Sequence, residues 1–272
     1  MIYNIIWYNK LNFMDNKSNV VKQAMILAAG EGTRMRPITN LIPKPMVEVD
    51  GKTIIERIID NLISYGIERI VISTCFKADI LENYIKSKYK DLKDVEIIFS
   101  REEELMNSGG GVDKALKDGK LKPNNFIIIN SDMIYSKFSE QLDNLINIHC
   151  NNNSKITMLL QEPRLSFGIE DKPTYFLNKK THELTKITSA NLKGKFCYVG
   201  LSIFNPSIFT TYQKTVEKFS LSEFFIQASK NNELYGFEST ERVYQIDKPH
   251  KIEECSKLLR EDKQNNNDCI TL

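Results

Sequence analysis

The sequence has little histidine, and its few cysteines are dispersed. Among 272 residues there are three histidines and five cysteines, and no two cysteines form a C-x-x-C pair. Zinc ribbons, redox dithiols and disulfide scaffolds depend on such spacing, so the sequence lacks their signature. We therefore expect reduced thiols in a cytoplasmic protein.

An excess of charge of one sign is also missing. Lysine and arginine number 37 against 35 aspartates and glutamates, a formal net charge of +2. This balance gives no overall field that would recruit nucleic acid or an anionic membrane, and no basic stripe or aromatic recognition motif is present. We expect partners of neither kind, and any bound anion must be held at a local site. The oligomeric state stays open.

Long apolar runs are absent as well, since no stretch approaches the roughly 20 residues that span a bilayer. Residues 1–13 are apolar and aromatic, but Asn4, Asn9 and Lys10 interrupt them and no small-residue cleavage site follows. We interpret residues 1–21 as a leader, disordered or not native, 22–262 as a single domain and 263–272 as a polar tail.

What is present is an alternation of short apolar runs and amphipathic stretches, which predicts an α/β fold, a Rossmann-like mixed sheet flanked by helices. The predicted strands are Ala24–Ala28, Arg69–Ser73, Val95–Phe99 and Phe126–Ile129, and the predicted helices are Thr53–Tyr65, Lys77–Lys88, Gly111–Lys117 and Phe138–His149.

The second half is richer in predicted strands, which indicates a β-rich insertion added to the sheet. Its strands are Lys155–Leu160, Tyr175–Leu177, Leu184–Thr188 and Tyr198–Phe204, with no helix before Pro206 or Leu221. A closing strand, Arg242–Ile246, and a last helix, Lys248–Arg260, follow, and the Asn-rich residues 264–268 predict a frayed end.

A glycine loop follows the first strand directly, in Leu27-Ala28-Ala29-Gly30-Glu31-Gly32-Thr33-Arg34. Small residues there let backbone N–H groups approach a phosphate closely. Met35 occupies the position of the third glycine of a dinucleotide-binding fingerprint, and Met46 that of the first glycine of a Walker A motif. The loop therefore predicts a phosphate cradle of another kind.

Two cations accompany this loop, Arg34 within it and Lys44 in Pro43-Lys44-Pro45. Proline on both sides restricts the backbone around the lysine, as expected where its direction matters. Arg34 and Lys44 could clamp a triphosphate and offset the charge that develops during its attack.

Residues 24–39 together with Pro43-Lys44-Pro45-Met46-Val47 resemble the signature of sugar-1-phosphate nucleotidyltransferases. Within that family the sequence is most similar to short bacterial N-acetylmuramate-1-phosphate uridylyltransferases, with mannose-1-phosphate guanylyltransferases as near neighbours. The resemblance implies the nucleotide-diphospho-sugar transferase fold. It also implies transfer of a nucleotidyl group from a nucleoside triphosphate to a sugar 1-phosphate, which favours UTP with an N-acetylmuramate-1-phosphate-like sugar.

The same resemblance implies roles for individual residues. Arg34, Lys44 and Asp132 would be catalytic, and Asp132 and Asp247 would hold Mg²⁺, although Pro249 stands where the family has glycine. Nucleotide contacts would come from residues 27–34, Asn107, Gly109 and Gly110, and sugar-phosphate contacts from Lys44, Gly168, Tyr198 and Gly200. The motif around Asn107 does not determine which nucleobase the nucleotide carries.

Three alternatives stay open besides the favoured substrate pair. The first is a mannose-1-phosphate guanylyltransferase, a near neighbour within the resemblance. A phosphocholine cytidylyltransferase shares the opening loop but has P-K-A and lacks the triple glycine, so Pro45 and Gly109-Gly110-Gly111 argue against it. A non-catalytic nucleotide-binding regulatory subunit would explain the altered setting of Asp247.

Overall fold

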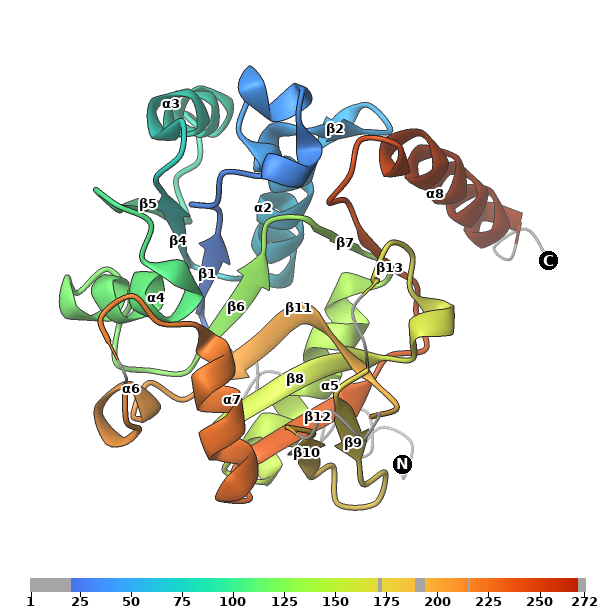
Figure 1. The fold of residues 1–272 in the computed structure, drawn as a ribbon. Helices are drawn as coiled ribbons and strands as arrows, with labels where there is room; N and C mark the ends of the chain where they lie inside the picture. The colour runs from blue at the N-terminus through green and yellow to red at the C-terminus, as the bar shows by residue number, and fades with distance from the viewer. Residues whose placement is uncertain (1–20, 171–172, 189–193, 215, 269–272) are drawn as a thin grey trace, which may run out of the picture.

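A seven-stranded mixed sheet forms the centre of the computed structural model, which describes residues 21–170, 173–188, 194–214 and 216–268 (Figure 1). The strand order is β12-β8-β11-β6-β1-β4-β5. Only β11 is antiparallel to its neighbours, β6 and β8, and the other pairs are parallel. The strands are β1 (Gln23–Leu27), β4 (Arg69–Thr74), β5 (Glu96–Arg101), β6 (Phe126–Asn130), β8 (Ile156–Gln161), β11 (Cys197–Phe204) and β12 (Leu234–Glu238). The predicted α/β fold with a mixed sheet is confirmed.

Helices cover both faces of this sheet, because its strands are apolar on both sides. Ile127 and Ile129 of β6 pack in one buried cluster with α2 and α5, while Phe126 and Ile128 pack in the other with α4 and α7. The helices are α2 (Ile54–Tyr65), α3 (Ala78–Lys88), α4 (Asn107–Lys117), α5 (Phe138–Asn151), α6 (Ile208–Thr211), α7 (Leu221–Lys230) and α8 (Lys251–Asp268).

Three small two-stranded sheets and four 3-10 turns surround the central sheet. The sheets pair β2 (Glu48–Val49) with β3 (Lys52–Thr53), β7 (Met133–Tyr135) with β13 (Val243–Gln245), and β9 (Tyr175–Leu177) with β10 (Leu184–Lys186). The turns are η1 (Thr33–Met35), η2 (Ile38–Asn40), η3 (Lys44–Met46) and η4 (Pro163–Leu165).

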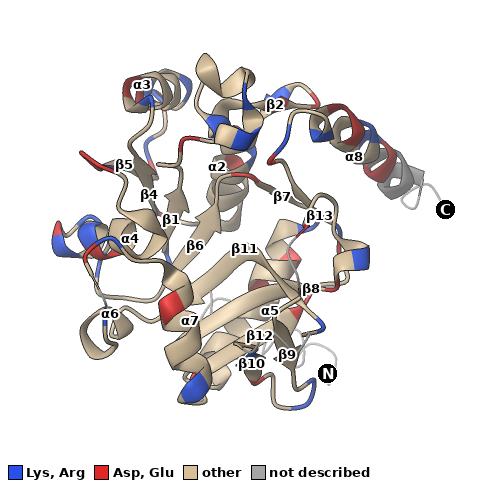
Figure 2. Cartoon of the chain, in the orientation of Figure 1, with Lys and Arg blue, Asp and Glu red and all other residues tan. Residues whose placement is uncertain are grey.

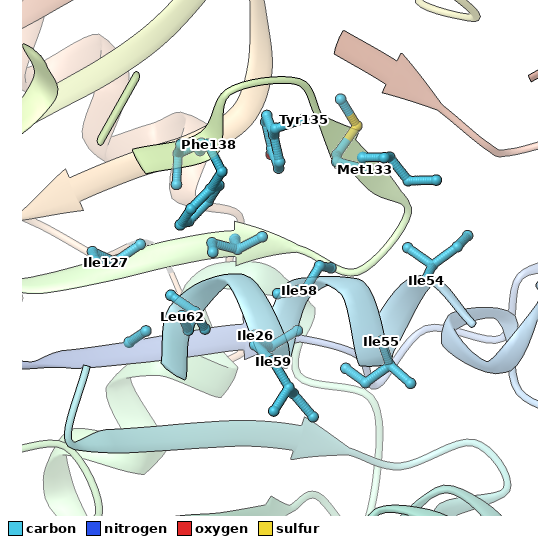
Figure 3. Close-up of a cluster of buried hydrophobic side chains, with 14 of the residues drawn as sticks. Ile26, Ile54, Ile55, Ile58, Ile59, Leu62, Ile127, Met133, Tyr135 and Phe138 are labelled. Atoms are coloured by element: carbon cyan, nitrogen blue, oxygen red, sulfur yellow. The ribbon is translucent and has the colours of Figure 1, made fainter. Parts of the chain in front are cut away.

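Helix α2 anchors the larger cluster and is defined at both ends by local sequence. Thr53 caps its N-terminus in a capping box with Glu56, and Gly66 ends it at φ 93°. The apolar residues between the caps lie on one face, and Figure 3 shows them gathered with side chains of β1, β6, β7 and α5. This packing fixes the strand ends that carry the site described below.

Glu56 of this capping box accepts hydrogen bonds from Tyr84 and the Thr53 amide, and its carboxylate pairs with Lys88 at 2.6 Å. Burial raises its pKa, but these partners outweigh burial and lower the pKa of Glu56 from 4.5 to about 2. A carboxyl group with a lowered folded-state pKa stabilises the fold above its unfolded pKa, and that contribution disappears as pH falls through the folded value.

We therefore expect Glu56→Gln to lower the free energy of unfolding by about 2 kcal/mol at pH 7. The deficit should shrink between pH 4.5 and about 2, because wild-type Glu56 loses its own charge there. Urea denaturation at pH 7 and pH 3 measures both values, with the exposed Glu253→Gln as control. An equal deficit at the two pH values would contradict this assignment.

Several predicted elements differ from the observed ones. Helix α4 begins at Asn107 rather than at Gly111, and strand β12 was not predicted. The predicted closing strand pairs with β7 as β13, outside the central sheet. Helix α8 continues to Asp268 and so includes residues 264–268, for which a frayed end remains a prediction. The leader predicted for 1–21 lies outside the described residues except for Val21, which is buried.

Candidate functional site

A cavity of about 310 Å³ lies at the carboxyl ends of β1 and β6, where ligands bind in open α/β sheets. Its lining residues come from four separate parts of the chain: Leu27, Gly30, Gly32, Thr33, Arg34, Lys44, Pro45, Asn130, Ser131, Asp132 and Asp247. The fold therefore brings together both predicted cations, both predicted metal ligands and most of the glycine loop. We call this the cradle cavity.

Gly32 is the tightest point of the glycine loop. Its φ is +63°, its carbonyl accepts a 2.9 Å hydrogen bond from Thr39 Oγ1, and a Cβ there would lie 2.8 Å from Lys44 Cβ. At Gly30, in contrast, an added Cβ would meet nothing within 4 Å. Gly32 thus lets the loop approach Lys44, whereas Gly30 leaves space at the cavity.

The other loop residues have supporting positions. Ala28 and Ala29 are buried, with the Ala28 amide donating to Ser73 Oγ and the Ala29 carbonyl accepting from the Phe76 amide. Glu31 is exposed, and its Oε2 lies 3.8 Å from Nη2 of Arg36. The structure places none of these three among the lining residues of the cradle cavity.

Lys44 begins the turn η3 between its two prolines and reaches across the cavity to Asp132, which lies between β6 and β7. Its Nζ lies 2.7 Å from Asp132 Oδ2, and both side chains are largely buried, at 14% and 13% exposed. Gln245 Nε2 donates to the same carboxylate oxygen at 3.4 Å. Lys44 and Asp132 therefore form a partly desolvated pair of opposite charge, in which electrostatic interactions are stronger than in water.

The pairing of β7 with β13 brings Asp132 and Asp247 to the same place. Met133 pairs with Gln245 in antiparallel register, and the Ile246 amide donates to the Asp132 carbonyl at 2.9 Å. Residues just before β7 therefore lie beside residues just after β13. Two carboxylates distant in sequence converge on one cavity through this short sheet.

Asp247 is almost fully buried and has a cation on each carboxylate oxygen. Arg34 Nη1 lies 2.6 Å from Oδ2, and Lys251 Nζ lies 2.6 Å from Oδ1. Lys251 also donates to the Gly168 carbonyl at 2.7 Å. We did not predict this role for Lys251, although its spacing of four residues from Asp247 at a helix start is a readable signal. Pro249 lies in the turn before α8, so the strand-to-helix connection is retained.

The triple glycine lies inside α4 rather than in an open loop. The Gly109 and Gly110 amides donate to the Phe219 carbonyl at 2.9 and 3.2 Å, and a Cβ on Gly109 would lie 2.3 Å from the Phe219 ring. Asn107, at φ 61°, donates through Nδ2 to the Lys218 carbonyl. These predicted nucleotide contacts do not line the cradle cavity, and the segment that packs on them is distant in sequence.

The predicted sugar-phosphate contacts are divided between two places. Gly168 at φ +81° packs against the Gln245 carbonyl, and Gly200 at φ +75° packs against Asn130 and Met133 beside the cradle cavity. Tyr198 points instead toward α7, where its ring lies 5.5 Å from that of Phe225. Gly200 coincides with an irregularity in the pairing of β11 with β8 between Tyr198 and Ser202.

Charges of both signs are mixed over the helices of the described chain, while the central strands carry few (Figure 2). Within the described ranges, no group of three or more His, Cys, Asp or Glu side chains is placed to hold a metal ion. The described helices include none long and apolar enough to cross a bilayer.

Two glycines, two cations and two aspartates gathered at the strand ends of an α/β sheet are the groups that a phosphate-binding site requires. Comparison with known proteins gives the class of protein. The family model described as nucleotidyl transferase matches residues 23–246, and the chain belongs to this family.

Two relatives resemble the chain in sequence, and one solved structure shares its fold. The chain is 30% identical over 193 residues to N-acetylmuramate alpha-1-phosphate uridylyltransferase of Caulobacter vibrioides, covering 70% of this chain and 78% of the relative. It is 28% identical over 238 residues to the mannose-1-phosphate guanylyltransferase catalytic subunit beta of Drosophila melanogaster, covering 80% of this chain and only 57% of that longer relative. A structure of UDP-glucose pyrophosphorylase complexed with UDP-glucose matches with a TM-score of 0.71 and 17% identity, over 89% of this chain and 99% of the other.

Proposed function

We propose that the protein transfers a nucleotidyl group from a nucleoside triphosphate to a sugar 1-phosphate, giving a nucleotide sugar and pyrophosphate. The observation that carries this proposal is the cradle cavity, where Arg34 and Lys44 reach Asp247 and Asp132 beside the glycine loop. Family membership and the activities of the relatives support the same reaction class.

In this reaction an oxygen of the sugar phosphate attacks the α-phosphorus of the triphosphate. A new P–O bond forms there as the bond to the β,γ-diphosphate breaks, and pyrophosphate leaves. A phosphate is already anionic near neutral pH, so no general base is required. The chain itself makes two contributions. The Gly30–Gly32 loop holds the phosphates so that the attacking and leaving oxygens are in line, and Arg34 and Lys44 offset the charge that develops.

We further propose that Asp132 and Asp247 hold Mg²⁺. Mg²⁺ uses few protein carboxylates and completes its octahedron with water and phosphate oxygens, so two aspartates lining one cavity fit it. A bound Mg²⁺ supplies charge neutralisation at the phosphates. Lys44, Arg34 and Lys251 hold the two carboxylates in place, and the first two can turn toward phosphate oxygens.

UTP with an N-acetylmuramate-1-phosphate-like sugar is the substrate pair we favour. The Caulobacter relative supports it with the higher identity and with greater coverage of its own length. GTP with mannose 1-phosphate is the second candidate, supported by the Drosophila relative. We also propose a cytoplasmic location, which follows from the dispersed cysteines.

The deciding experiment is a pyrophosphate-release assay with Mg²⁺, in which UTP, GTP, CTP and dTTP are each combined with a panel of sugar 1-phosphates. We expect release with at least one sugar 1-phosphate, and none without it. Choline phosphate in place of the sugar tests the cytidylyltransferase alternative. If no combination releases pyrophosphate while nucleoside triphosphates still bind, the regulatory-subunit alternative replaces this proposal.

A further inference from the structure

A second cavity, of about 360 Å³, lies where the β9–β10 hairpin, the start of β11 and α7 meet. Its lining includes the aromatic residues Tyr175, Tyr198 and Phe225, the hydroxyl residues Thr174 and Ser222, and Lys186. No aspartate or glutamate is among its lining residues. A pocket with aromatic walls and a few polar groups is typical of a small-molecule site. We call it the lysine pocket.

Lys186 is the unusual group in this pocket. It pairs in register with Tyr175 across the hairpin, and its Nζ lies 3.0 Å from the Tyr175 hydroxyl and 4.6 Å from the centre of that ring. Burial lowers the pKa of Lys186, and no carboxylate offsets that effect. No carboxylate within the described ranges lies in ion-pair contact with Lys186, although a partly buried ammonium group is normally paired.

The lysine pocket lies at the same edge of the central sheet as the cradle cavity. Leu201 pairs with Ile129 in antiparallel register, so the beginning of β11 extends past the carboxyl end of β6. Gly200 packs directly on Asn130, which lines the cradle cavity, and Tyr135 donates to the Val199 carbonyl at 2.9 Å. Tyr198, which lines the lysine pocket, directly precedes Val199 in β11.

We propose that the lysine pocket binds a carboxylate carried by the acceptor sugar, with Lys186 as its ionic partner. This inference rests on the proposed function, whose favoured acceptor already carries a carboxylate, and adds the pocket and the residue that would hold that carboxylate. A carboxylate supplies the negative charge that Lys186 lacks, and its oxygens accept hydrogen bonds from the ammonium group and nearby hydroxyls. The apolar face of a sugar ring can pack on the aromatic walls.

The test compares acidic sugar 1-phosphates with their neutral parents. One probe carries a carboxylate at C6 of the ring and one a carboxyethyl ether at C3, and each is assayed for kcat/KM beside the parent sugar. We expect the wild-type protein to prefer at least one acidic probe, and Lys186→Met to lower kcat/KM for that probe by about tenfold to a hundredfold. The value for the neutral parent should change less than about threefold.

Two further variants separate a specific role from a general one. Lys179→Met removes a lysine from the exposed turn of the same hairpin and should leave the preference unchanged, while Lys186→Arg should restore part of it. Calorimetric titration with the acidic sugar 1-phosphate measures binding without turnover. If wild type and Lys186→Met show the same ratio of acidic to neutral sugar in kinetics and in titration, the inference is overturned.

The proposed function can fail separately. Absence of turnover with every nucleotide and sugar, combined with Lys186-dependent binding of the acidic probe, would overturn the transferase assignment and keep the carboxylate site. Turnover of sugar 1-phosphates that is unaffected by replacement of Lys186 would keep the transferase assignment and overturn the carboxylate site.

Discussion

Replacing Lys44 with methionine should lower kcat by about a hundredfold to a thousandfold. The flanking prolines restrict the backbone at Lys44, and its ammonium group lies 2.7 Å from Asp132 Oδ2 in the cavity where we place the triphosphate. Loss of one preorganised charge from a partly desolvated site removes stabilisation of the transition state that water does not replace. Asp132→Asn should lower kcat to a similar degree, because it removes the charge while keeping the side-chain shape.

Steady-state pyrophosphate release measures both effects, and thermal unfolding confirms that each variant folds. Lys52→Met is the matched control, since Lys52 pairs with Asp60 outside the cradle cavity. If Lys44 and Asp132 act together in the reaction, the double variant should be little worse than either single variant. Activity of the single variants within about threefold of wild type would contradict the placement of the reaction in this cavity.

Gly32→Ala should lower kcat/KM by about a hundredfold, the second largest effect we expect. An alanine Cβ would lie 2.8 Å from Lys44 Cβ and 3.1 Å from Thr39 Cγ2, so the loop and Lys44 must move apart. Displacement of a group that positions substrate by about 1 Å is enough for a loss of this size. The change should appear in the reaction far more than in the global stability.

Gly51→Ala is the control for backbone strain. Gly51 has a similar φ of +71°, but an added Cβ would meet nothing within 4 Å. Both substitutions place alanine in the left-handed region, which costs about 1 kcal/mol, yet only the one at Gly32 disturbs Lys44. Equal losses of kcat/KM in the two variants would show that strain, rather than the contact with Lys44, is responsible.

Local patterns predicted the elements that depend on neighbouring residues. Helix α2 could be predicted because its apolar face, its Thr53 cap and its Gly66 stop are all local features. The glycine loop and the Pro-Lys-Pro turn were recognisable for the same reason, and the structure places Arg34, Lys44, Asp132 and Asp247 around one cavity.

Long-range packing determined what the sequence did not predict. Helix α4 includes its three glycines because the distant Phe219 carbonyl accepts hydrogen bonds from two of their amides. The role of Lys251 depends on the pairing of β7 with β13, and the separation of Tyr198 from the cradle cavity depends on an irregularity in β11. Local periodicity contains no information on the contact with Phe219 or on the pairing of β7 with β13, because the partners are about a hundred residues apart, whereas the spacing of Lys251 from Asp247 is local.

The short β7–β13 sheet also has a consequence for synthesis of the chain. The Asp132 carbonyl accepts a hydrogen bond from the Ile246 amide. The Asp247 carboxylate accepts one from Arg34, which lies 213 residues earlier in the chain. A nascent chain folds from its N-terminus as it leaves the ribosome, so the glycine loop and β6 emerge long before β13. The cradle cavity is therefore completed only when the last strand has been released, and truncated chains that end before Asp247 lack the carboxylate that holds Arg34.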